Sequence, residues 1–149
     1  MKLFGRVRGS LLCERNTPVV NAKQAIGWWE ARRVPFNLIV GSAGVVSVAI
    51  VSVVSLGAYF LFNSDFGLPD PPLFAVISVM LYAVVVNICY TGGWIVELLI
   101  RSVWPEQADR FATLSLSLGL TLTILVTLLP GIVVGVAGIF GLAGHLIGR

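Results

Sequence analysis

Charged side chains are scarce in this chain, and their scarcity argues against a soluble fold. Only 11% of the 149 residues are Asp, Glu, Lys or Arg, whereas 57% are hydrophobic. A soluble domain carries about 25% charged residues, most of them on its wetted surface. The composition therefore predicts an integral membrane protein, and the length leaves room for three or four membrane spans.

Histidine and cysteine are also scarce, which argues against catalytic and metal sites. The single histidine is His145, and the two cysteines are Cys13, in a basic segment, and Cys89, in an apolar run. A metal centre needs several His, Cys or carboxylate ligands, and a catalytic triad needs a histidine beside an acid and a nucleophile. We therefore expect no catalytic, metal-binding or cofactor-binding residues, no disulfide and no enzymatic activity.

The apolar residues form four runs, each long enough to cross most of a bilayer as a helix. The runs cover residues 36–62, 73–93, 111–129 and 132–148. A helix rises about 1.5 Å per residue through a hydrocarbon core roughly 30 Å thick. The predicted fold is an all-α integral membrane helical bundle with four transmembrane helices, the last two joined by a turn at Pro130 and Gly131. The alternative is three helices, the last being long and kinked.

The segment TLSLSLGLTLT, residues 113–123, alternates leucine with small or polar residues, a period typical of β-strands. A lone strand in lipid would leave its backbone groups unpaired, so we predict a helix here. In a helix the alternation becomes two rows of small residues spaced by four, a pattern that lets membrane helices approach closely; a polar pore lining is the alternative. With two glycines of the last run, the predicted packing residues are Ser115, Gly119, Thr123, Gly135 and Gly141.

Basic residues concentrate ahead of the first apolar run. Those that precede residue 36 are Lys2, Arg6, Arg8, Arg15, Lys23, Arg32 and Arg33. The segment after this run, NSDFGLPDPP, contains two aspartates and no Lys or Arg. Because basic residues favour the cytoplasmic side of a membrane, we expect a cytoplasmic N-terminus. Four spans would leave every basic residue on that side, whereas three spans would place Arg149 on the other.

The basic region is predicted to form a domain of its own. We expect residues 1–35 to be a cytoplasmic tail with an N-terminal interfacial helix, in which Thr17 is the cap and Pro18 the first helical residue. Residues 36–149 are then the transmembrane bundle. The few charges of the tail are interrupted by apolar residues, so the expected partners are membrane lipids rather than nucleic acid.

Polar residues recur at spacings of three and four on one face of the second predicted helix, which comprises the second apolar run and the segment WIVELLIRSVW that follows it. Glu97 lies near the membrane interface and needs a partner. Either Arg101, four residues later, or Arg32 or Arg33 at the start of the first span would supply one. We expect a polar clasp between two helices, with a functional site as the alternative. Its predicted members are Arg32, Arg33, Asn37, Asn87, Tyr90, Trp94, Glu97 and Arg101.

The segments WWEARRVPFN and NICYTGGWIVE resemble a pattern found in small bacterial multi-span membrane proteins that have no assigned activity. Those proteins carry an aromatic-Glu-x-Arg-Arg run before an aromatic-Asn pair, and an Asn-x-Cys-Tyr segment followed by an acidic residue. The matching residues are Trp29, Glu30, Arg32, Arg33, Phe36, Asn37, Asn87, Cys89, Tyr90 and Glu97. The resemblance covers the first two spans and implies a bacterial inner (cytoplasmic) membrane.

The expected function follows from the lack of catalytic residues and from the rows of small residues. We expect a non-enzymatic scaffold or accessory subunit of a membrane complex, in contact with other membrane protein subunits or with itself. The alternative is a small channel or pore-forming homo-oligomer. Co-purification with a fixed partner favours the first hypothesis, and ion conductance of a purified oligomer favours the second.

Overall fold

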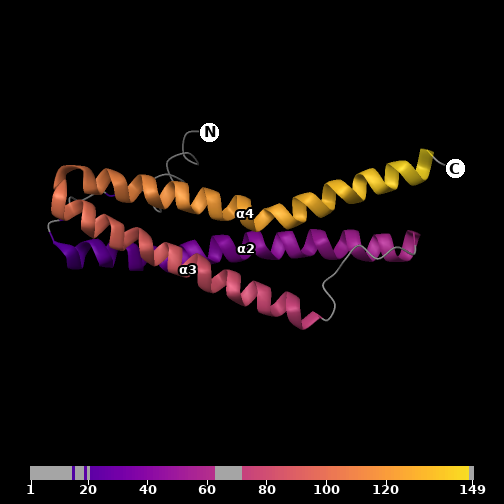
Figure 1. Ribbon diagram of the computed structural model, residues 1–149, viewed down its shortest axis with the longest axis horizontal. Coiled ribbons are helices and arrows are strands. Elements are labelled where there is room, and N and C mark those ends of the chain that lie inside the picture. Colours follow the sequence, from indigo (N-terminus) through magenta and orange to yellow (C-terminus); the bar gives the residue numbers. More distant parts are fainter. Residues whose placement is uncertain (1–14, 16–18, 20, 63–71, 148–149) are drawn as a thin grey trace, which may run out of the picture. The chain divides into compact units, whose positions relative to one another are not determined.

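The structure is a computed structural model that describes Arg15, Val19 and residues 21–62 and 72–147. Within these ranges the chain forms three helices and no strand: α2 (Ala22–Phe62), α3 (Pro72–Val103) and α4 (Pro105–Ile147) (Figure 1). All three are long and apolar enough to span a membrane. The all-α prediction is therefore confirmed, and the TLSLSLGLTLT segment is helical. A fourth helix and a separate interfacial helix are not shown.

The helices divide between two compact units, which are described separately. Unit 1 consists of the described residues within Met1–Ile39 and Ala83–Thr123, and unit 2 of those within Val40–Tyr82 and Ile124–Arg149. Each helix contributes one part to each unit. The predicted division after residue 35 falls inside α2, which continues through Pro35.

The start of α2 is fixed by a side-chain cap. The Asn21 side-chain oxygen accepts a hydrogen bond of 2.9 Å from the backbone N–H of Gln24. Such a bond satisfies one of the backbone donors that a helix leaves unpaired in its first turn. The helix therefore begins at Ala22. The expected cap at Thr17 and Pro18 lies outside the described residues, as does Cys13.

The corner between α3 and α4 is a single residue, Trp104. Its backbone N–H donates to the carbonyl of Ile100, and its carbonyl accepts from Gln107. Pro105 then occupies the first position of α4, where the missing N–H costs nothing, and Glu106 follows in the positively polarised first turn. The polar PEQADR segment, residues 105–110, consequently forms the beginning of α4.

The predicted turn at Pro130 and Gly131 lies inside α4, which continues to Ile147. In unit 2 the backbone N–H of Gly131 donates a 3.0 Å hydrogen bond to the Ser47 hydroxyl of α2. A Cβ atom built on Gly131 would lie 3.0 Å from the Ser47 Cα. The absent side chain of Gly131 thus permits a close approach of two helices. Pro130 removes one backbone hydrogen bond from α4, a loss that membrane helices tolerate.

Beyond this point α4 keeps running alongside α2 within unit 2. Gly135 faces Ile50 and Gly138 faces Val54, so the contacts advance toward the C-terminus on both helices. The two segments are therefore parallel. Also in unit 2, the hydroxyls of Tyr82 and Thr127 form a 2.6 Å hydrogen bond that joins α3 to α4.

Candidate functional site

The candidate site is a buried carboxylate in unit 1, that of Glu97 on α3. Its side chain is 0% exposed. The Oε1 atom accepts hydrogen bonds of 2.7 Å from Arg15 and from Arg101. The Oε2 atom accepts a bond of 2.6 Å from the Trp29 indole N–H and one of 3.2 Å from Arg15. Both oxygens of the carboxylate are thus occupied by donors of the protein itself.

A second carboxylate, that of Asp109 on α4, completes the arrangement. Its Oδ1 atom accepts a 2.7 Å hydrogen bond from Arg15 and a further bond from Arg101. Arg101 also donates to the backbone carbonyl of Val19, at 2.7 Å. We call the four residues Arg15, Glu97, Arg101 and Asp109 the charge cluster. Its two positive and two negative charges cancel. Its ion pairs connect Arg15, which precedes α2, to the end of α3 and the start of α4.

The side chains of the charge cluster differ in how far they are exposed. The side chains of Arg15 and Arg101 are 3% and 14% exposed, whereas that of Asp109 is 35% exposed. Buried ion pairs stabilise a fold only when additional hydrogen bonds satisfy their remaining donors and acceptors. The hydrogen bond from Trp29 to Glu97 and that from Arg101 to the Val19 carbonyl are two such additional bonds. The four donated hydrogen bonds occupy both oxygens of Glu97, so the charge cluster is a closed network of ion pairs and hydrogen bonds within the described residues.

Aromatic residues pack around Trp29, the residue that donates its indole N–H to Glu97. The Tyr90 hydroxyl donates a 2.6 Å hydrogen bond to the backbone carbonyl of Trp29, and the two rings meet edge to face at 5.3 Å. Phe36 packs against the same tyrosine at 4.7 Å. A Cβ atom on Gly93 would lie 3.0 Å from the Trp29 ring, so this glycine leaves the space that the indole fills.

Neither arginine of the WWEARR segment pairs with Glu97, contrary to the expectation from the sequence. The Arg32 guanidinium lies 4.0 Å from the centre of the Trp28 ring and donates to the Trp28 carbonyl. Arg33 pairs with Glu30 at 3.0 Å, which is one turn away on the same helix. Of the expected partners, Arg101 therefore does pair with Glu97, and Arg15 takes the place of Arg32 and Arg33. Trp28 is also covered by Arg15, at 4.4 Å.

The other predicted clasp residues lie along α2 and α3 in unit 1. Asn37 and Asn87 exchange two hydrogen bonds of 3.2 and 3.1 Å across the two helices. Arg33 donates to the Thr91 hydroxyl at 3.0 Å. The indole N–H of Trp94 is buried without a hydrogen-bond partner among the described residues. Polar contacts between α2 and α3 thus run from the Asn37–Asn87 pair through Arg33 and Thr91, and the charge cluster lies further along α3.

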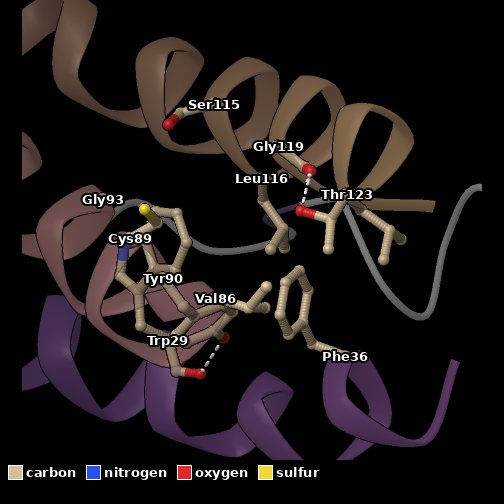
Figure 2. Close-up of a pocket in the computed structure, with 11 residues that line it drawn as sticks. Trp29, Phe36, Val86, Cys89, Tyr90, Gly93, Ser115, Leu116, Gly119 and Thr123 are labelled. Atoms are coloured by element: carbon tan, nitrogen blue, oxygen red, sulfur yellow. Dashed lines mark hydrogen bonds between the residues drawn. The ribbon is translucent and has the colours of Figure 1, made fainter. Parts of the chain in front are cut away.

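The predicted packing residues have different environments. Ser115, Gly119 and Thr123 line a cavity of about 100 Å³ in unit 1 (Figure 2). A Cβ atom on Gly119 would have no heavy atom within 4 Å, so this glycine is not a point of helix contact. Gly135 does contact α2 in unit 2, where its Cβ would lie 3.4 Å from Ile50. Gly141 lies on an exposed part of α4.

Two members of the charge cluster carried no useful sequence signal. Arg15 is 82 residues from Glu97, and its neighbours in the sequence suggested contact with lipid. Asp109 belongs to the polar PEQADR segment, residues 105–110, and no spacing relates it to Glu97. Among the described residues there is no group of three or more His, Cys, Asp or Glu placed to hold a metal ion, and the side chain of His145 lies outside them.

The chain was compared with protein-family models, with curated proteins and with solved structures, and none of the three comparisons gives a match. The class of the protein is therefore read from the structure alone: the described residues form an all-α protein with three helices long and apolar enough to span a membrane.

Proposed function

We propose that this chain is a non-enzymatic integral membrane protein that serves as a scaffold or accessory subunit of a membrane complex. The observation that carries the proposal is the state of Glu97, a buried carboxylate with both oxygens bonded to groups of the same chain. Carboxylates inside membrane helices are functional candidates by default, because they are costly to bury. Here the cost is offset internally, which supports a structural task.

The outward surface of the helices supports an interaction role. In the most hydropathic stretch of each helix, only 6 to 17% of the residues are buried inside the chain. Most apolar side chains of the three helices therefore face lipid or the helices of other proteins. A chain that packs so little of its own surface is suited to assembly with membrane-embedded partners.

The proposed location is a bacterial inner membrane, with the N-terminus in the cytoplasm and three crossings. The resemblance of the WWEARR and NICY segments to bacterial membrane proteins supports the compartment, and the basic residues ahead of α2 support the orientation. In unit 2 the parallel course of α2 and α4 supports placing both C-terminal ends on the opposite side. Membrane lipids are then the partners of the exposed helix surfaces.

A pore-forming homo-oligomer is the second candidate, and one observation favours it. Ser117 and Thr121 are exposed on α4, one turn apart, so copies of this helix would present a hydroxyl row to a shared channel. The Thr121 hydroxyl donates to the carbonyl of Ser117, which leaves its oxygen available to accept a hydrogen bond from water.

The test is extraction of an affinity-tagged chain from its native membrane into polymer-bounded lipid discs, followed by crosslinking and mass spectrometry. The scaffold proposal predicts a partner polypeptide at fixed stoichiometry, retained when the same tag is moved from one terminus to the other. A chain that purifies only with copies of itself, and that conducts ions after reconstitution into liposomes, would establish the pore instead. A chain that purifies alone and conducts nothing would contradict both candidates.

A further inference from the structure

A cavity in unit 1 is lined on its α4 side by the small residues Ser115, Gly119 and Thr123. Its volume is about 100 Å³, and it is walled by α2, α3 and α4. Figure 2 shows Leu116 reaching down from α4 toward Phe36 and Val86, with Trp29 and Tyr90 to one side. Glycine at position 119 contributes to the open space, because a Cβ atom there would meet no heavy atom within 4 Å.

The chemistry of the walls favours hydrocarbon over water. The Tyr90 hydroxyl already donates to the Trp29 carbonyl, and the Thr123 hydroxyl donates to the Gly119 carbonyl. The remaining lining is mainly aromatic and aliphatic. A buried water needs two to four polar partners, and apolar cavities of comparable size stay dry and take up apolar molecules. Because few lining groups are polar, the cavity is better suited to a short stretch of alkyl chain than to water.

The cavity also opens toward the outside of the helices. Trp29, Phe36 and Leu116 are buried, but two other lining residues, Cys89 on α3 and Gly119 on α4, are exposed. The cavity is thus not enclosed at these two positions, which belong to the apolar spans of α3 and α4. In a membrane, exposed positions at that depth meet lipid chains rather than water.

We propose that this cavity is a lateral binding site for the hydrocarbon chain of a membrane lipid, which enters between Cys89 and Gly119 and ends against Leu116 and Phe36. The inference rests on the membrane location proposed above. The chain end would replace the missing packing contacts beside Trp29 and Tyr90, the aromatic pair next to Glu97. A bound lipid chain would then stabilise the position of Trp29, which donates its hydrogen bond to Glu97 of the charge cluster.

The experiment uses the full chain in phospholipid nanodiscs that contain a phosphatidylethanolamine with a diazirine on one acyl chain. After irradiation, mass spectrometry locates the crosslinked residues on α4. Leu116 and Leu118 are two residues apart in the sequence but are 4% and 69% exposed, so Leu118 reports lipid around the protein and Leu116 reports lipid inside the cavity. The proposal predicts adducts on both residues.

A matched pair of variants provides the control. Gly119→Leu should fill the cavity and abolish the Leu116 adduct while leaving that of Leu118 unchanged. Gly92→Leu also adds a side chain where a Cβ meets nothing within 4 Å, but it lies outside the cavity, so both adducts should persist. Cys89→Leu closes the same entrance from α3 and should repeat the result of Gly119→Leu if that variant fails to fold.

The outcomes separate this inference from the proposed membrane location. Adducts on Leu118 without adducts on Leu116 in the unmodified chain would overturn the lateral site and leave the membrane location standing. Adducts on neither residue would overturn both. Persistence of the Leu116 adduct in folded Gly119→Leu and Cys89→Leu would also overturn the site, because the crosslink would then not depend on the entrance.

Discussion

Trp29 and Glu97 are 68 residues apart in the sequence and are joined by one hydrogen bond, from the indole N–H to the carboxylate, at 2.6 Å. Trp29 lies one helical turn before Arg32 and Arg33, the arginines that the sequence suggested as partners of Glu97. The bond shows that α2 meets the carboxylate through its aromatic residue, while the positive charge comes from Arg15 and Arg101.

The first prediction concerns the pair of Glu97 and Arg15. Glu97→Gln and Arg15→Gln should each lower the free energy of unfolding in mixed micelles, because removing one member of a buried ion pair costs roughly 3–5 kcal/mol. The double variant should lose less than the sum of the two losses, by about 0.5–3 kcal/mol, since the interaction can be lost only once.

Arg33→Gln is the control for this cycle, because Arg33 contacts Glu30 and Thr91 instead of Glu97. Its effect should add to that of Glu97→Gln. The observed pairing would be contradicted if the stability losses of Glu97→Gln and Arg15→Gln were additive, or if those of Glu97→Gln and Arg33→Gln were not.

The second prediction isolates the indole hydrogen bond. Trp29→Phe retains an aromatic ring but removes the donor, and a hydrogen bond to a charged group contributes about 1.5–3 kcal/mol. The variant should therefore unfold at a lower temperature in detergent. Trp28→Phe should have a smaller effect, because the Trp28 indole N–H is buried without a partner among the described residues. Equal losses would mean that ring volume, not the donor, determines stability here.

The third prediction compares two adjacent glycines of α3. Gly93→Ala should destabilise the protein, because its Cβ would lie 3.0 Å from the buried Trp29 ring. Gly92→Ala places a Cβ in open space and should be neutral or stabilising, since alanine is favoured over glycine in a helix by about 1 kcal/mol. Thermal unfolding of both variants measures the difference. A more stable Gly93→Ala protein would show that the indole has room to move.

The fourth prediction concerns the close approach of α2 and α4 in unit 2. Gly131→Ala should lower stability, because the added methyl group would lie 3.0 Å from the Ser47 backbone, which cannot rotate away. Gly119→Ala, on the same helix, should be tolerated because its Cβ has no neighbour within 4 Å. Circular dichroism during thermal unfolding in detergent checks both. Tolerance of Gly131→Ala would contradict the close contact.

The helices themselves were largely predictable, because uninterrupted apolar residues in lipid leave the backbone few alternatives to a helix. The exception is Pro130 followed by Gly131, a pair that usually marks a turn. The proline removes one donor, but the glycine brings the Ser47 hydroxyl within 3.0 Å of the next backbone N–H. Whether such a pair ends a helix therefore depends on the neighbouring helix, which a single sequence does not reveal.

The charge cluster was predictable only in part. Spacing along α3 placed Arg101 one turn from Glu97, since residues four apart share a helix face. Arg15 and Asp109 come from other segments, and no periodicity relates them to Glu97. The position of Arg33, directed to Thr91 and Glu30, depends on the rotation of α2. The sequence thus indicated which residues need partners, whereas the tertiary packing selected the partners.

The most direct test of the account is the labelling of single cysteines in a bacterial host, because three crossings with a cytoplasmic charge cluster are its central claim. Cys13 and Cys89 are replaced by serine, and one cysteine is introduced as Gln107→Cys, in the first turn of α4, or after Arg149. A membrane-impermeant maleimide should label the C-terminal cysteine in intact cells and the position 107 cysteine only after permeabilisation. A C-terminal cysteine that also reacts only after permeabilisation would contradict three crossings and restore the four-span arrangement.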